Sequence, residues 1–243
     1  MIINTYRTAD ELGEQAAVQA EKYLNEAIKQ KGYARLILST GASQFEFLKN
    51  LITKEIDWTK VEMFHLDEYL NLSIEHKASF RKYLKERFIN HVNLKEAYLI
   101  NGEQDPSVII DELSKKLNEK PVDLALIGIG ENAHIAFNDP PADFNTQDSY
   151  IVVDLDDDCK YQQVNEGWFC DLSEVPNQAI SMTVSQILKS NVIISVVPHK
   201  AKAHAIKQTV ENEVSNQLPA TALKNHPNWH LFLDTNSASE LKN

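Results

Sequence analysis

The chain has 243 residues, of which 43% are hydrophobic and 24% are charged, and its formal net charge is -11. This length is enough for one α/β domain with a sizeable core, and the negative charge argues against binding nucleic acid or an anionic membrane. No stretch is long and apolar enough to span a bilayer, and the N-terminus lacks the apolar segment of a signal peptide. The two cysteines, Cys159 and Cys170, show no CxxC spacing, so we expect free thiols in a cytoplasmic protein.

Strands and helices are predicted to alternate along the whole chain. Residues 8–30 have the pattern of an amphipathic helix, with Thr8 as N-cap, Glu11 three residues later and Gly32 at its end. The other predicted helices are residues 44–54, 76–91, 106–118 and 200–211. The predicted strands are residues 35–39, 61–66, 97–100, 123–127, 150–154, 179–183, 191–197 and 229–233.

Strands separated by helices of this length indicate an α/β fold with a doubly wound, mostly parallel sheet and helices on both faces. We expect residues 1–243 to form a single domain. Residues 139–176 have the least regular pattern, which fits either a lid or flap over a site or a long surface connection.

The segment 123–141 carries the strongest functional signal. A buried strand breaks at Gly128 and Gly130, which allow a sharp turn and close approach of a ligand. A polar cluster follows, made of Glu131, Asn132, His134, Asn138 and Asp139. Because ligands of parallel α/β sheets bind where strands end, a His with carboxylate and amide neighbours there predicts acid–base chemistry. The alternative is a glycine-rich turn with a solvated His.

Two further strand ends predict an anion site. Residues 40–43 lead from a strand into a helix N-terminus, where free backbone N–H groups and hydroxyls favour a phosphate. Lys200 and Lys202 lie in the first turn of a helix, against its dipole, which also suggests a bound anion. Ordinary helix capping and surface lysines are the alternatives.

A third feature lies at 65–69, His-Leu-Asp-Glu-Tyr. Asp67 stands where an apolar strand stops, and residues two apart on a strand share a face, so His65 and Asp67 are expected to point the same way. A turn-forming Asp is the alternative.

Taken together, these segments resemble the glucosamine-6-phosphate deaminase/isomerase family, a relative of the 6-phosphogluconolactonases. The specific parts are Leu-Asp-Glu-Tyr at 66–69 and Gly-Ile-Gly-Glu-Asn-Ala-His-Ile-Ala-Phe-Asn at 128–138. The resemblance implies a Rossmann-like fold of the deaminase, ribose-5-phosphate isomerase and CoA-transferase type. It implies a phosphorylated amino sugar as partner and no metal or organic cofactor, and it leaves a homo-oligomer open.

The resemblance also implies roles for individual residues. Asp67 matches the general base that moves a proton between C2 and C1, and His134 matches the residue that opens the sugar ring. Asp139 and Asn132 match the residues that orient this His. The matches to the phosphate-binding residues are Thr40, Gly41, Ala42, Ser43 and Lys202.

The chain departs from the family pattern at several places. Ala42 and Gln44 replace a usual Gly and Pro, and Asp139 replaces a longer Glu. A phosphate-binding arginine expected near residues 162–169 is absent, and Arg81 and Lys200 are the candidates for the missing charge.

Glucosamine 6-phosphate is therefore the first candidate substrate and galactosamine 6-phosphate the second. A lactonase acting on a sugar-phosphate lactone is disfavoured by residues 134–138. A non-catalytic sugar-phosphate sensor would need the phosphate loop and Lys202 but not Asp67 and His134 together.

Overall fold

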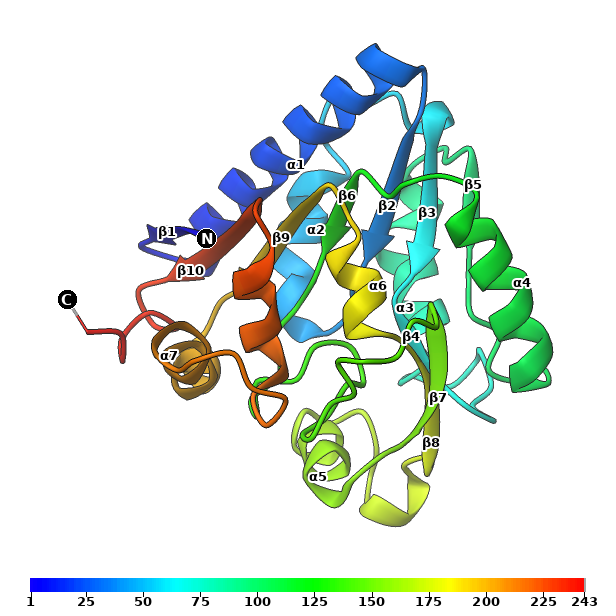
Figure 1. Cartoon of the computed structure of the whole chain (residues 1–243), viewed down its shortest axis with the longest axis vertical. Coiled ribbons are helices and arrows are strands. Elements are labelled where there is room, and N and C mark those ends of the chain that lie inside the picture. The colour runs from blue at the N-terminus through cyan, green and yellow to red at the C-terminus, as the bar shows by residue number, and fades with distance from the viewer. Residues whose placement is uncertain (243) are drawn as a thin grey trace.

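A computed structural model describes residues 1–242, apart from the side chain of Asp158. Seven strands form one sheet in the order β1-β10-β9-β6-β2-β3-β5, and every neighbouring pair is parallel (Figure 1). The strands are β1 (Ile2–Tyr6), β2 (Ala34–Leu38), β3 (Val61–His65), β5 (Glu96–Tyr98), β6 (Leu124–Leu126), β9 (Val192–Val197) and β10 (Trp229–Asp234).

Helices cover both faces of this sheet because the strands are apolar on both sides. Leu36 and Leu38 of β2 pack on one face, and Ile37 between them packs on the other. The first face is covered by α1 (Ala9–Lys31), α2 (Phe45–Leu51) and α3 (Phe80–Arg87). The second is covered by α4 (Pro106–Asn118), α6 (Val184–Leu188) and α7 (Ala203–Glu211). The predicted doubly wound α/β fold is confirmed.

The ends of α1 show how closely local sequence sets the elements. The Thr8 hydroxyl accepts a hydrogen bond from the backbone N–H of Glu11 at 3.2 Å, and Gly32 ends the helix with a φ of 79°. The predicted helix 76–91 is shorter in the structure, because Ser79 caps it and α3 starts at Phe80. Strand β1 and helix α6 were not predicted.

A second sheet was also not predicted as such. It is antiparallel, with β4 (Asp67–Tyr69) paired to β8 (Gln178–Met182) and β8 paired to β7 (Tyr150–Asp154). Only Leu66 separates β3 from β4, so the chain passes directly from the large sheet into the small one. Helix α5 (Asp157–Asn165) follows β7 and lies at the same end of the molecule (Figure 1).

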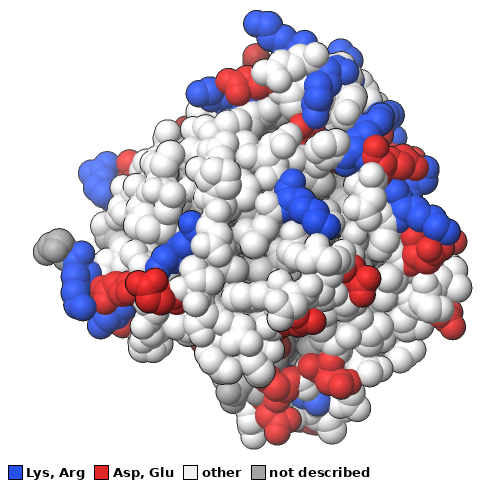
Figure 2. Space-filling view, viewed as in Figure 1, with Lys and Arg blue, Asp and Glu red and all other residues white. Residues whose placement is uncertain are grey.

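Within residues 1–242, none of the helices combines the length and the apolar composition that crossing a membrane requires. On the face drawn in Figure 2, acidic and basic side chains are intermixed around the periphery and much of the middle is uncharged.

Candidate active site

A cavity of about 200 Å³ opens at the carboxyl ends of the parallel strands. It is lined by the loops that follow β2, β3, β6 and β9, and by residues from α5 and the turn after it. Strand β3, which follows β2 along the chain, lies on one side of β2, and the later strand β6 lies on its other side. The order of the strands therefore reverses between β2 and β6. Ligands of open α/β sheets bind at such a switch point. The structure brings Asp67, His134 and Lys202 together around this cavity.

Asp67 is the first residue of β4 and is only 6% exposed. Its Oδ1 has no hydrogen-bond partner among the described residues. Burial, with a smaller contribution from the negative charge of Glu68, raises the pKa of Asp67 to about 8. A desolvated carboxylate of this kind is a stronger base than a solvated one.

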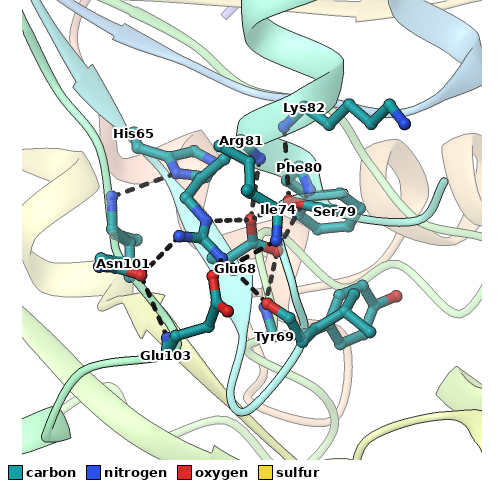
Figure 3. A network of polar contacts seen from close by, with 12 residues as sticks. His65, Glu68, Tyr69, Ile74, Ser79, Phe80, Arg81, Lys82, Asn101 and Glu103 are labelled. Atoms are coloured by element: carbon teal, nitrogen blue, oxygen red, sulfur yellow. Dashed lines mark hydrogen bonds and ion pairs between the residues drawn. The ribbon is translucent and has the colours of Figure 1, made fainter. Parts of the chain in front are cut away.

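Glu68, the next residue, points away from the cavity into a buried polar network (Figure 3). Its carboxylate accepts hydrogen bonds from the Ser79 hydroxyl at 3.0 Å and from the backbone N–H groups of Phe80 and Arg81 at 3.1 and 2.8 Å. It therefore fixes β4 to the N-terminus of α3, where the helix dipole favours a negative charge.

Arg81 belongs to this network and not to the cavity. Its guanidinium lies 3.4 Å from Glu68, donates to the carbonyl of Leu72 at 2.9 Å, and pairs with Glu103 at 2.9 Å. The prediction that Arg81 supplies a phosphate-binding charge is therefore wrong, because its donors are used within the fold.

His65 is also excluded from the cavity, and the expectation that it shares a direction with Asp67 is wrong. It is fully buried, its Nδ1 accepts from the backbone N–H of Ile100 at 3.4 Å, and burial lowers its pKa to about 3. The rule that residues two apart share a face holds within one strand. Here β3 ends at His65 and a strand of another sheet begins at Asp67.

His134 lies in the loop after β6 and is held by two neighbours. Its Nδ1 lies 3.0 Å from Oδ1 of Asp139, and its backbone N–H donates to the Asn132 side chain at 3.0 Å. Asn132 in turn donates to Asp139 at 3.2 Å. Burial opposes ionisation of Asp139, but its contacts with His134 and Asn132 hold its pKa below the usual value. The shorter Asp side chain thus still reaches the imidazole.

Gly130 is required by this arrangement. A Cβ atom at position 130 would lie 2.3 Å from the ring of His134. The glycine therefore provides the space that lets the imidazole lie over the loop.

The predicted anion-binding segments lie on the same cavity. Thr40, Gly41, Ala42 and Ser43 line it. Gln44 joins this loop to the end of β9, since its side-chain amide donates to the carbonyl of Val196 at 3.0 Å.

Lys202 faces the loop from the other side. It is 8% exposed, and burial lowers its pKa. It makes no ion pair with the described residues, so its ammonium is available to an anionic ligand. Lys200 is exposed, and its ammonium lies 2.7 Å from the hydroxyl of Ser239, so the prediction that it serves the cavity is wrong.

Several further side chains of the cavity wall were not assigned to the site from the sequence. Gln162, Glu166 and Trp168 reach it from α5 and the following turn, and His199 reaches it from the loop after β9. The Glu166 carboxylate accepts from Gln162 at 2.8 Å and from the Trp168 indole at 3.0 Å. No periodicity marks residues that face a cavity from a short helix.

Both cysteines are free thiols, as predicted. Cys159 is buried on α5 beside Asp139, and burial together with that carboxylate raises its pKa. Among the side chains that the structure describes, no group of three His, Cys, Asp or Glu is placed to hold a metal ion.

The chain is similar to known proteins over nearly its whole length. The sequence profile described as glucosamine-6-phosphate isomerases/6-phosphogluconolactonase matches residues 7–231. A glucosamine-6-phosphate deaminase of Streptococcus uberis is 35% identical over 211 residues, covering 86% of this chain and 88% of the relative. One from Streptococcus pneumoniae is 34% identical over 229 residues, covering 93% of this chain and 96% of the relative.

Solved structures give the same picture. A monomeric glucosamine-6-phosphate deaminase of the NagB superfamily superposes with a TM-score of 0.88 at 28% identity, covering 98% of this chain and 99% of the other. The 6-phosphogluconolactonase of Trypanosoma brucei superposes with a TM-score of 0.81 at 13% identity, covering 99% of this chain and 98% of the other. The second likeness concerns the fold alone.

The buried carboxylate of Asp67 predicts a pH-dependent stability. Its pKa of about 8 in the folded protein lies above the ordinary 3.8, so between these values the folded protein holds a proton that the unfolded chain has lost. The free energy of unfolding therefore falls as the pH rises from about 4 to about 8. We expect Asp67→Asn to melt several degrees above wild type at a pH of about 8.5 and to match it at about 4, in thermal scans at both pH values. An equal effect at both would contradict the burial penalty. Asp111→Asn, on the exposed side of α4, is the control.

Proposed function

This chain belongs to the glucosamine-6-phosphate isomerase/6-phosphogluconolactonase family, and we propose that it is an amino-sugar 6-phosphate deaminase. It converts glucosamine 6-phosphate and water into a ketose 6-phosphate and ammonia. The observation that carries the proposal is the convergence of Asp67, His134 and Lys202 on one cavity.

In the proposed complex the substrate phosphate lies between the loop 40–43 and Lys202. The ammonium of Lys202 supplies charge, and the hydroxyls of Thr40 and Ser43 supply hydrogen bonds. Because Lys202 is largely withdrawn from water, its attraction to a phosphate is weakly screened. This end of the cavity fixes the position of the sugar.

His134 opens the pyranose ring. It gives a proton to the ring oxygen and accepts one from the C1 hydroxyl, so that the ring C–O bond breaks and an aldehyde forms. Asp139, whose Oδ1 lies 3.0 Å from Nδ1, orients the imidazole.

Asp67 then moves the proton that defines the isomerisation. Its carboxylate removes the proton from C2 of the open-chain sugar and delivers it to C1. The C1 oxygen takes up a proton and the nitrogen gives one up, so that a C1 hydroxyl and a C2 imine are left. Water adds to this imine, the C–N bond breaks and ammonia leaves, which gives the ketose. The substrate ammonium beside Asp67 favours the ionised carboxylate, which offsets its raised pKa.

The other candidate functions are less well supported. The lactonases among the similar structures share the fold at low identity, whereas the streptococcal relatives at 35% and 34% identity are deaminases. A non-catalytic sensor has no use for a desolvated carboxylate and an oriented imidazole in the phosphate cavity. Galactosamine 6-phosphate stays the second candidate substrate, because the loop 40–43 departs from the family pattern at Ala42.

The proposal extends to the whole protein. Residues 1–243 act as a single domain, and residues 139–176 act as a lid, since Gln162, Glu166 and Trp168 of this segment line the cavity.

The free cysteines fit a cytoplasmic enzyme. The similar deaminase of known structure is described as monomeric, and we take a monomer as the working state. The homo-oligomer considered from the sequence is the alternative that light scattering would reveal.

The role of Asp67 is tested by Asp67→Asn, which keeps the shape of the side chain and removes the base. We expect ammonia release from glucosamine 6-phosphate to fall by at least about 10³-fold, while calorimetry shows that the substrate still binds. Asp111→Asn is expected to keep full activity. Turnover by Asp67→Asn near the wild-type rate would rule out Asp67 as the base.

The role of His134 is tested by His134→Ala. Because the sugar phosphate in the assay is mostly a closed ring, we expect kcat to fall by about 10²–10⁴-fold with a smaller change in KM. The same ammonia assay measures both. His204→Ala, an exposed position on α7, is the control. A variant that handles the closed ring as fast as the parent would show that another group opens it.

A further inference from the structure

Two loops on the phosphate side of the cavity share one unusual backbone conformation. Gly41 follows β2 with φ 109° and ψ 161°, and His199 follows β9 with φ 80° and ψ 148°. Each stands immediately before a 3₁₀ turn, Ala42–Gln44 in the first loop and Lys200–Lys202 in the second, and each turn leads into a helix. This backbone region is essentially restricted to glycine, because a Cβ atom strains it. A histidine at 199 therefore needs a reason.

The fold does not supply that reason. The His199 backbone N–H donates to the Asp234 carboxylate at 3.2 Å, and its carbonyl accepts from the backbone N–H of Lys202 at 3.1 Å. A glycine would make both hydrogen bonds. The imidazole is exposed, and it makes no hydrogen bond to any of the described residues. Among the described residues the side chain thus makes no hydrogen bond that compensates for the strain.

The charge balance of the cavity gives a reason. Among the described residues, Lys202 is the only Lys or Arg that lines it, whereas Asp67, Glu131 and Glu166 all line it. A phosphate group needs more donors than one ammonium, and an imidazole provides an N–H donor in either protonation state. His199 lines the same cavity three residues before Lys202 and is tied to it by the turn.

We propose that His199 is a phosphate-binding residue, acting with Lys202 and the loop 40–43, and that its strained backbone is retained because it directs the imidazole into the cavity. The identity of the anion as a sugar phosphate rests on the proposed deaminase function. The anion site itself does not, and it is testable without turnover.

Two substitutions separate the side chain from the backbone. His199→Ala removes the imidazole and keeps the strain, and His199→Gly removes both. We expect both variants to bind inorganic phosphate, and the phosphorylated sugar, about tenfold more weakly by calorimetry. We expect only His199→Gly to melt higher than wild type, by roughly 2–6 °C without ligand.

The matched control is Asn71→Gly, which replaces a positive-φ residue outside the cavity (φ 58°) and is expected to leave phosphate binding unchanged. Wild-type phosphate affinity in both His199 variants would overturn the proposal, as would weaker sugar binding with unchanged phosphate binding. A His199→Gly variant that melts no higher than His199→Ala would overturn the claim of strain. If wild type releases no ammonia but the phosphate and melting results hold, the deaminase function fails while the site assignment stands.

Discussion

The chemistry of the cavity follows from the burial of one carboxylate, that of Asp67, at the junction of two sheets. The chain leaves the parallel sheet at His65 and enters the antiparallel sheet at Asp67, so the side chain of Asp67 is set at the floor of the cavity and shielded from water. The next residue, Glu68, turns away and is held by Ser79, Phe80 and Arg81 (Figure 3). Burial of Asp67 and the negative charge of Glu68 beside it both raise the pKa of Asp67, which makes it a stronger base.

The other groups of the cavity are positioned by the same topology. Parallel strands end at one edge, so loops that are distant in sequence meet there. The loop after β6 brings His134 with Asp139 behind it, and the turn after β9 brings Lys202 opposite the loop after β2. The rigid sheet fixes these distances, while the backbone is strained in the loops, at Ala133, Ala136 and His199. Strain concentrated around a cavity is typical of sites in which function and stability compete.

Much of this could be predicted from the sequence, and the failures have physical reasons. The helix at 106–118 and the strand at 150–154 were predicted at their observed bounds, because capping and alternation are local signals. The motifs predicted five site residues that meet at the cavity or directly behind it, namely Asp67, His134, Asn132, Asp139 and Lys202. The prediction for His65 was wrong because it required one continuous strand through Asp67. The predictions that Arg81 and Lys200 supply charge to the cavity were wrong because both side chains bind partners that are distant in sequence. The backbone conformation of His199 has no sequence signal, because its cause is the turn in three dimensions.

Asp67 is a desolvated carboxylate whose pKa burial raises to about 8, and the titration of this one group distinguishes it from a solvated aspartate. With aspartate labelled at the carboxyl carbon and Asp67→Asn used to assign the signal, carbon NMR follows the ionisation of Asp67 across the pH range. We expect a transition near the value of about 8 that burial imposes. A transition near 4, as for a solvated aspartate, would contradict it.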